Sequence, residues 1–163
     1  MVPHRQTRLH ALSPTLYEVR PLTEAEIGQA FPLVREIAGA LSLADWRRYA
    51  GQSLAAGRGI GRDGGFIGAR QHGSIYLRGL CAYRLFPDLA AQNRFMAGCF
   101  AVPETIDCVA VARALIGACT SIAESANCGA VQIHLVERNQ WIASLLREAG
   151  FAADQRAYAR LMP

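Results

Sequence analysis

The stretch that decides the fold covers residues 93–113 and reads NRFMAGCFAVPETIDCVAVAR. Its apolar run, residues 95–102, is typical of a buried strand, and a short polar break at residues 103–105 follows. A helix with apolar periodicity then opens near Asp107. A strand that leads through a short loop onto a helix presents free backbone N–H groups and the positive end of the helix dipole, which attract phosphate. Every α/β protein contains such junctions, so the functional meaning of this junction depends on the residues that flank it.

Length and composition bound the class of protein. The chain has 163 residues, of which 52% are hydrophobic, so we expect one folded domain over residues 1–163. No apolar run approaches the roughly 18 residues that a membrane helix needs, and no apolar stretch follows the basic residues near the start. We therefore expect a cytoplasmic protein with no membrane partner and no signal peptide.

Cysteine and charge patterns exclude further classes. The five cysteines are odd in number and form no C-x-x-C pair, which favours buried thiols in a reducing compartment over a disulfide framework or a metal site. Arginine supplies all 17 basic residues, and the net charge of +4 favours anionic ligands. The arginines are scattered, with no basic stripe between aromatics, so we expect no nucleic-acid partner.

The first half of the chain predicts a strand, two helices and a glycine-rich segment. Residues 1–14 are a loose polar arm, and residues 16–22 form a strand. Thr23 and Glu26 have the spacing of a capping box, and the helix that follows contains Pro32. A second helix spans residues 43–56, with Trp46 and Tyr49 on its inner side. The glycine-rich residues 57–65 are either a turn or a ligand loop; their place before a strand favours the turn.

The second half predicts a hairpin followed by alternating helices and strands. Strands over residues 66–71 and 74–86 are joined at His72-Gly73. After the strand at residues 94–102, we expect a helix over residues 108–127 that Gly129 caps. A strand over residues 130–136, a helix over residues 140–149 and one or two closing strands complete a mixed sheet with helices on its faces.

A known family has the sequence motif N-x-x-A-x-x-L-Y-x-x-x-G-F. Its spacing is matched here by Asn139, Leu145 and Gly150-Phe151. In these residues and in its order of elements, residues 16–162 resemble the GNAT N-acyltransferase superfamily. Residues 102–104 and 113–115 are similar to the edges of that family's coenzyme motif. The resemblance implies an α/β (α+β) fold: a mixed, mostly antiparallel sheet of about six to seven strands, with helices on both faces.

The same resemblance implies transfer of an acetyl group from acetyl-CoA to an amine, carried by a small molecule or a protein, and a homodimer is the default assembly. Two strands, ending near Val102 and Val136, would separate to hold the coenzyme. The residues so assigned to the coenzyme are Phe100, Ala101, Val102, Cys108, Val109, Ala110, Val111, Ala112 and Asn139.

The acceptor amine must lose a proton, so a base is required directly or through water. The catalytic candidates are Glu104 and Glu137. Tyr83 and His134 are further candidates, and His134 is alternatively a hydrogen-bonded core histidine. Cys108, at the start of a helix, is either a reactive thiol or a buried inert one.

Three residues depart from the family's pattern and keep a second reading open. Asp107 stands where the family's motif has a cation or an amide, and we expect it to be a helix N-cap instead. Ala110 replaces a glycine that lets the backbone approach the pyrophosphate. Leu146 replaces the tyrosine that protonates the departing thiolate, although a thiol is already a tolerable leaving group near neutral pH. The alternative is an inactive scaffold of the same fold that serves as a binding module.

Overall fold

The computed structural model describes residues 16–56, 64–87, 92–154 and 157–162. The predicted arm at residues 1–14 and residues 57–63 of the glycine-rich segment lie outside the described residues. Residues 64–65, the end of that segment, belong to a strand.

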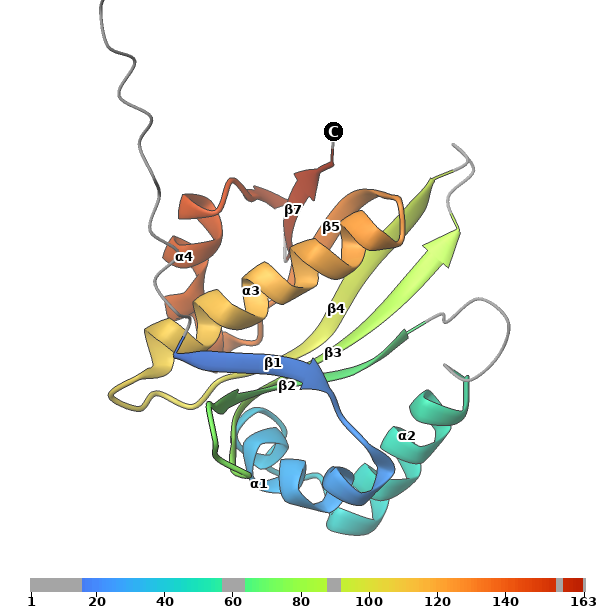
Figure 1. The fold of residues 1–163 in the computed structure, drawn as a ribbon, viewed down its shortest axis with the longest axis vertical. Coiled ribbons are helices and arrows are strands. Elements are labelled where there is room, and N and C mark those ends of the chain that lie inside the picture. Colours follow the sequence, from blue (N-terminus) through green and yellow to red (C-terminus); the bar gives the residue numbers. More distant parts are fainter. Residues whose placement is uncertain (1–15, 57–63, 88–91, 155–156, 163) are drawn as a thin grey trace, which may run out of the picture.

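Seven strands form one sheet in the order β1-β2-β3-β4-β5-β7-β6 (Figure 1). Neighbouring strands pair antiparallel, with the exception of the parallel pair β4–β5. This confirms the mixed, mostly antiparallel sheet predicted from the sequence. The strands are β1 (Tyr17–Pro21), β2 (Gly64–Gln71), β3 (Leu77–Pro87), β4 (Asn93–Ala101), β5 (Cys128–His134), β6 (Ala152–Asp154) and β7 (Ala157–Leu161).

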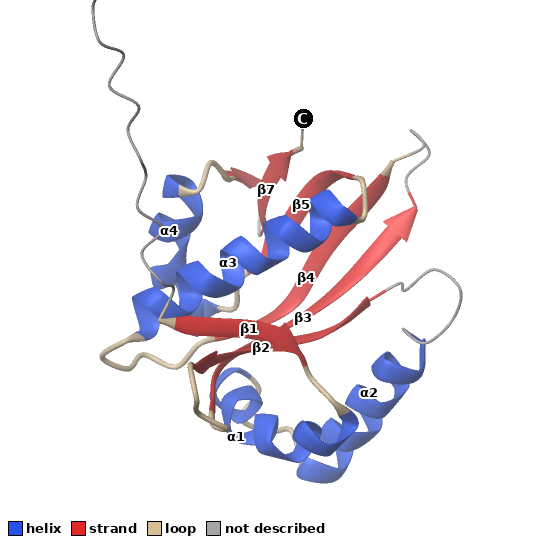
Figure 2. Cartoon of the chain, viewed as in Figure 1, coloured by secondary structure: helices blue, strands red, loops and turns tan. Residues whose placement is uncertain are grey.

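Helices cover both faces of the sheet (Figure 2). One face carries α1 (Ile27–Ile37) and α2 (Leu43–Ala56), and the other carries α3 (Cys108–Ser125) and α4 (Ala143–Glu148). Short 3-10 helices precede two of them: η1 (Glu24–Glu26) leads into α1, and η2 (Glu137–Ile142) leads into α4. We refer to the two sides of the sheet as the α1/α2 face and the α3 face.

Two hydrophobic clusters fill the space between these layers. On the α3 face, Phe95, Leu115 and Ile133 are fully buried together with Leu146, so Leu146 is a core residue. On the α1/α2 face, Trp46 and Phe66 pack edge to face with ring centroids 5.4 Å apart. The indole N–H of Trp46 donates to the carbonyl of Ile27 at 2.6 Å and so ties α2 to α1.

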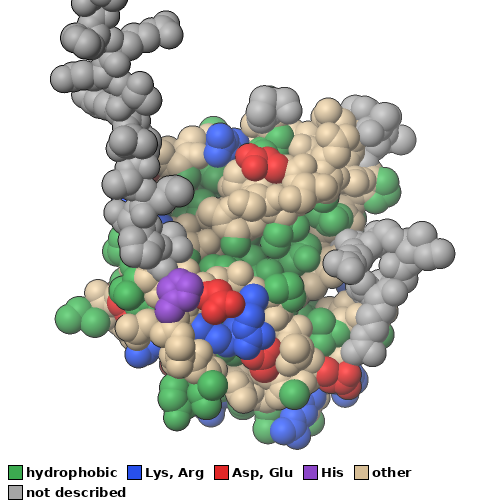
Figure 3. Space-filling model, viewed as in Figure 1, with side chains coloured by type: hydrophobic (Ala, Val, Ile, Leu, Met, Phe, Trp, Pro, Cys, Tyr) green, Lys and Arg blue, Asp and Glu red, His purple; other side chains and the backbone are tan. Residues whose placement is uncertain are grey.

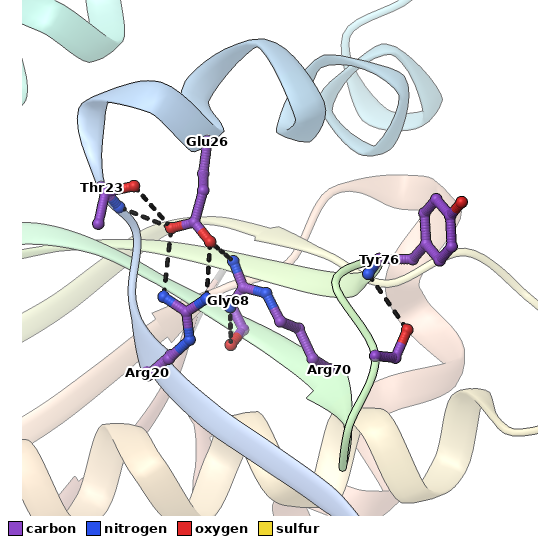
Figure 4. A network of polar contacts seen from close by, with 7 residues as sticks. Arg20, Thr23, Glu26, Gly68, Arg70 and Tyr76 are labelled. Atoms are coloured by element: carbon purple, nitrogen blue, oxygen red, sulfur yellow. Dashed lines mark hydrogen bonds and ion pairs between the residues drawn. The ribbon is translucent and has the colours of Figure 1, made fainter.

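The predicted Thr23–Glu26 pair forms and belongs to a larger network (Figure 4). The Glu26 carboxylate accepts from the Thr23 N–H at 2.8 Å and hydroxyl at 3.0 Å, from Arg20 at 2.8 Å and from Arg70 at 2.6 Å. Arg70 is 2% exposed. Burial alone raises the pKa of Glu26, but the hydrogen bonds from Thr23 and Arg20 and the charge of Arg70 outweigh it and hold that pKa low. Glu26 therefore joins β1, β2 and the start of α1.

Several predicted details were wrong. The left-handed residue after α3 is Asn127, with φ 52°, whereas Gly129 lies in β5. The last helix begins as the 3-10 helix η2. Tyr49 was expected on the inner side of α2, but it is 49% exposed. Residue 74 stays in the hairpin turn, because its N–H bonds the Gln71 carbonyl at 2.9 Å.

The expectation that no segment has the length and apolar content of a membrane span also needs correction. Helix α3 has 18 residues and a mean hydropathy of 1.4, enough to cross a membrane by length and composition only. Arg113 and Glu124 are its only charged residues. A third of it is buried inside the structure, and core helices pass the same test.

The face shown in Figure 3 carries acidic and basic side chains in contact with one another below an apolar band. The charges on this face form no continuous basic stripe. Ion pairs among the described residues include those of Glu26 with Arg20 and Arg70.

Candidate functional site

Strands β4 and β5 separate part-way along their length. Their pairing runs from Asn93↔Cys128 to Ala97↔Ile133 and ends there. Beyond Ala97, β4 stays paired with β3, through Cys81↔Phe100 and Leu80↔Ala101. One edge of β4 is thus released from β5 at Gly98, as the resemblance implies.

A β-bulge at Gly98 accounts for this separation. Ala82 pairs with Cys99 and Tyr83 pairs with Ala97, so Gly98 is an extra residue in β4. A bulge bends its strand and increases the local twist, which turns the end of β4 away from β5. Gly98 is exposed, and a Cβ built on it would meet nothing within 4 Å, so the backbone here is open to a ligand.

Asn139 lies in the wedge between the separated strands. It is 3% exposed, and its side-chain amide donates to the carbonyl of Phe100. This carbonyl therefore points away from β3, and in an extended strand the N–H of the same residue points the same way. The N–H of Phe100 thus also points away from β3, although Phe100 is only 1% exposed, while Asn139 braces η2 against β4. Its predicted contact with the coenzyme stays a prediction.

The first turn of α3 has free donors. The N–H of Cys108 bonds the Thr105 carbonyl at 3.1 Å, and the N–H of Val111 bonds the Asp107 carbonyl at 3.1 Å. The N–H groups of Val109 and Ala110 have no hydrogen-bond partner in the part of the chain that the structure describes, and both residues are exposed. With the helix dipole, they make an anion seat.

The other residues assigned to the coenzyme lie differently. Val111 and Ala112 are buried against the sheet, and Ala101 and Val102 are buried at the end of β4. Their side chains therefore face the core, and none of these four residues is more than 2% exposed.

Asp107 occupies the N-cap position of α3, but its side chain does not cap the helix. One carboxylate oxygen accepts from the Tyr17 hydroxyl, and the other accepts from Thr105 Oγ1 at 2.7 Å. These bonds lower the pKa of Asp107, the Tyr17 contact most, and the same contact raises the pKa of Tyr17. The carboxylate is thus ionised at neutral pH and drawn toward β1.

The comparisons with known proteins agree with this geometry. No protein-family model and no curated protein matches the chain. Among solved structures, a probable acetyltransferase is 18% identical with a TM-score of 0.71, covering 90% of this chain and 97% of its own. A GNAT-family acetyltransferase from Streptococcus pneumoniae is 9% identical with a TM-score of 0.67. The match covers 90% of this chain and 99% of the acetyltransferase. The chain has the GNAT fold. A putative acetyltransferase from Salmonella typhimurium, solved with its cofactor acetyl-CoA, is 7% identical with a TM-score of 0.65. The match covers 91% of this chain and 95% of that protein.

Within this GNAT fold, the two predicted bases lie on different connections. Glu104 follows β4 in the loop before α3, and Glu137 begins η2 after β5. Both are exposed, and neither has a hydrogen bond or ion pair within the described residues. Their catalytic role stays a prediction.

His134 lies on the α1/α2 face of the sheet, and its role as a base stays a prediction. Because Met96 pairs with Gln132, the side chains of Gln132 and His134 share the face of the sheet on which Met96 lies. Nε2 of His134 is buried and has no hydrogen-bond partner among the described residues. At this atom, His134 is therefore not the hydrogen-bonded core histidine of the alternative prediction. Tyr83 instead stacks on Phe95, with ring centroids 5.0 Å apart, on the α3 face.

The thiols are not all buried, contrary to the sequence-based expectation. Cys99 and Cys108 are partly exposed, whereas Cys81 and Cys119 are buried with their sulfurs 3.7 Å apart. Burial raises the pKa of Cys99 to about 11, which makes this thiol a poor nucleophile at neutral pH. Among the described residues, no three metal-ligating side chains gather.

A cavity of about 360 Å³ opens on the α1/α2 face, beside the separated strands. Side chains of α2, β2, β3 and β4 line it, and Gly98 lies at its border. Sequence reasoning missed this site, because its residues come from four elements and share no motif.

Proposed function

We propose that this protein is an acyl-CoA-dependent N-acyltransferase that transfers the acetyl group of acetyl-CoA to an amine. The observation that carries the proposal is the pair of backbone N–H groups left free at Val109 and Ala110, next to the point where β4 and β5 separate. The amides of Val109 and Ala110 suit the pyrophosphate. The N–H of Phe100 suits an acceptor oxygen of the pantetheine arm or the thioester.

In the proposed reaction, the amine nitrogen attacks the thioester carbonyl. The new C–N bond forms, the C–S bond breaks, the amine proton passes to a base directly or through water, and coenzyme A leaves as a thiolate. Glu104 and Glu137 are the predicted bases, and His134 adds an imidazole near the same edge. A thiol with a pKa near 8.5 leaves without strong acid assistance, so Leu146 in the core is compatible with turnover.

A second candidate function is an inactive scaffold of the GNAT fold. It is favoured by Asp107, whose ionised carboxylate lies beside the anion seat. In this alternative the chain retains the fold but binds no acyl-CoA.

Calorimetry with acetyl-CoA separates the two. We expect micromolar binding, and a loss of about tenfold in Val109→Pro, which removes one free N–H in the first helical turn. The matched control, Val109→Ala, keeps the N–H and should bind like the wild type. No binding at about millimolar acetyl-CoA would contradict the proposal and support the scaffold.

A further inference from the structure

The cavity on the α1/α2 face has the size and lining of a small-molecule site. Its volume of about 360 Å³ lies within the roughly 300–1,000 Å³ of such sites. Arg84 and Met96, which pair across β3 and β4, form its floor, and Phe66 and the α2 residue Tyr49 form a wall. The body of a ligand here would contact aromatic and aliphatic side chains.

Among the described residues that line the cavity, charge has one sign. Arg84 is the only charged residue of this described lining. This guanidinium is exposed and has neither a hydrogen bond nor an ion pair within the described residues. A polyamine would find no carboxylate among the described lining residues and would be repelled by Arg84, whereas a carboxylate could bind Arg84 in bidentate fashion.

The cavity also reaches the open edge of β4. Gly98 borders the cavity and marks the point where β4 leaves β5, and Phe100 lies two residues further. Met96, the partner of Arg84, is four residues from Phe100, which is roughly 13 Å of extended strand. His134, with its unpartnered Nε2, follows the last β5 residue that pairs with β4. A ligand held at Arg84 could therefore extend along β4 to this edge.

We propose that the cavity is the acceptor site and that its substrate is an elongated amine with an anionic group at the opposite end of an apolar, aromatic body. Arg84 binds the anionic group, Phe66 and Tyr49 pack on the body, and the amine lies near Phe100 and His134. This inference rests on the proposed acetyl transfer, and it names the class of acceptor.

The test compares 4-(2-aminoethyl)benzoate with phenethylamine, which has the same body without the carboxylate, and with spermidine. Binding of each is measured by calorimetry without coenzyme, and turnover by thiol release from acetyl-CoA. We expect the aminobenzoate to bind about tenfold more tightly than phenethylamine and to be the best acceptor. Arg84→Gln should remove this preference while leaving phenethylamine and acetyl-CoA binding unchanged. Arg147→Gln, which removes an exposed arginine on α4, should retain the preference.

Equal binding of the aminobenzoate and phenethylamine, a preference that survives in Arg84→Gln, or tighter binding of spermidine would overturn the inference. Failure of the proposed function is distinguishable. In that case acetyl-CoA neither binds nor is consumed, while amine binding without coenzyme still reports on Arg84.

Discussion

At the scale of single residues, Asp107 is the point where the chain departs most from a coenzyme-binding loop. The structure draws its carboxylate to Tyr17 and Thr105, and the N–H groups of Val109 and Ala110 stay free. The negative charge remains beside these donors and should weaken the binding of an anion.

Asp107→Asn tests this effect. The amide retains an acceptor oxygen for the Tyr17 hydroxyl but removes the charge, which at about 4 Å opposes a phosphate by about 1 kcal/mol in water. We expect acetyl-CoA to bind about threefold to tenfold more tightly, measured by calorimetry. Tyr17→Phe, which retains the charge, should give no such gain. Weaker binding in Asp107→Asn would mean that the carboxylate does not face the coenzyme.

Glu26 should make stability depend on acid pH. Its pKa is lowered in the folded state, so its contribution is present above the unfolded value near 4.3 and is lost as the pH falls through the folded value. Glu26→Gln leaves the buried Arg70 without its counter-charge, and we expect a loss of about 3 kcal/mol at pH 7. Urea unfolding near pH 3.5 should show a smaller difference between variant and wild type. A difference that does not change with pH would contradict this assignment.

At the scale of elements, the separation of β4 from β5 depends on the bulge at Gly98 and on the brace from η2. Asn139→Ala removes the donor to the Phe100 carbonyl and leaves that group buried without a partner. We expect a loss of about 1–3 kcal/mol in unfolding free energy, together with a lower rate of acetyl transfer. Arg147→Ala, at an exposed position of the adjoining helix α4, should change neither. Unchanged stability in Asn139→Ala would show that η2 holds β4 in another way.

The order of elements could be predicted because periodicity and turn residues encode it locally. Helix α2 begins and ends where its apolar pattern does, and the Thr23–Glu26 pair forms as its spacing indicates. The C-terminal cap of α3 was placed at Gly129, since glycine adopts the left-handed region most easily, but Asn127 also tolerates it. In that case two residues could fill the role, and local preference did not decide between them.

The candidate site was predictable only where it is made of consecutive residues. The free donors at the start of α3 follow from the strand-loop-helix order. The bulge at Gly98, the bond from Asn139 to Phe100 and the contact of Tyr17 with Asp107 join segments far apart in the sequence. Arg84 is one of 17 arginines, and only the pairing of β3 with β4 places it in a cavity.

At the scale of the whole molecule, the two substrates would approach one split sheet from different sides. Acetyl-CoA would bind at the start of α3 and along the free edge of β4. The acceptor would enter from the cavity under α2, and the reacting groups would meet where β4 leaves β5.

The most direct test of this arrangement is an NMR titration of isotope-labelled protein with acetyl-CoA. We expect the backbone amide resonances of Phe100, Val109 and Ala110 to shift together, with one dissociation constant, while that of Gly129, at the start of β5 beyond the far end of α3, stays in place. Binding that leaves these three amides unshifted, or no binding at about millimolar ligand, would contradict the claim that this open backbone is the coenzyme site.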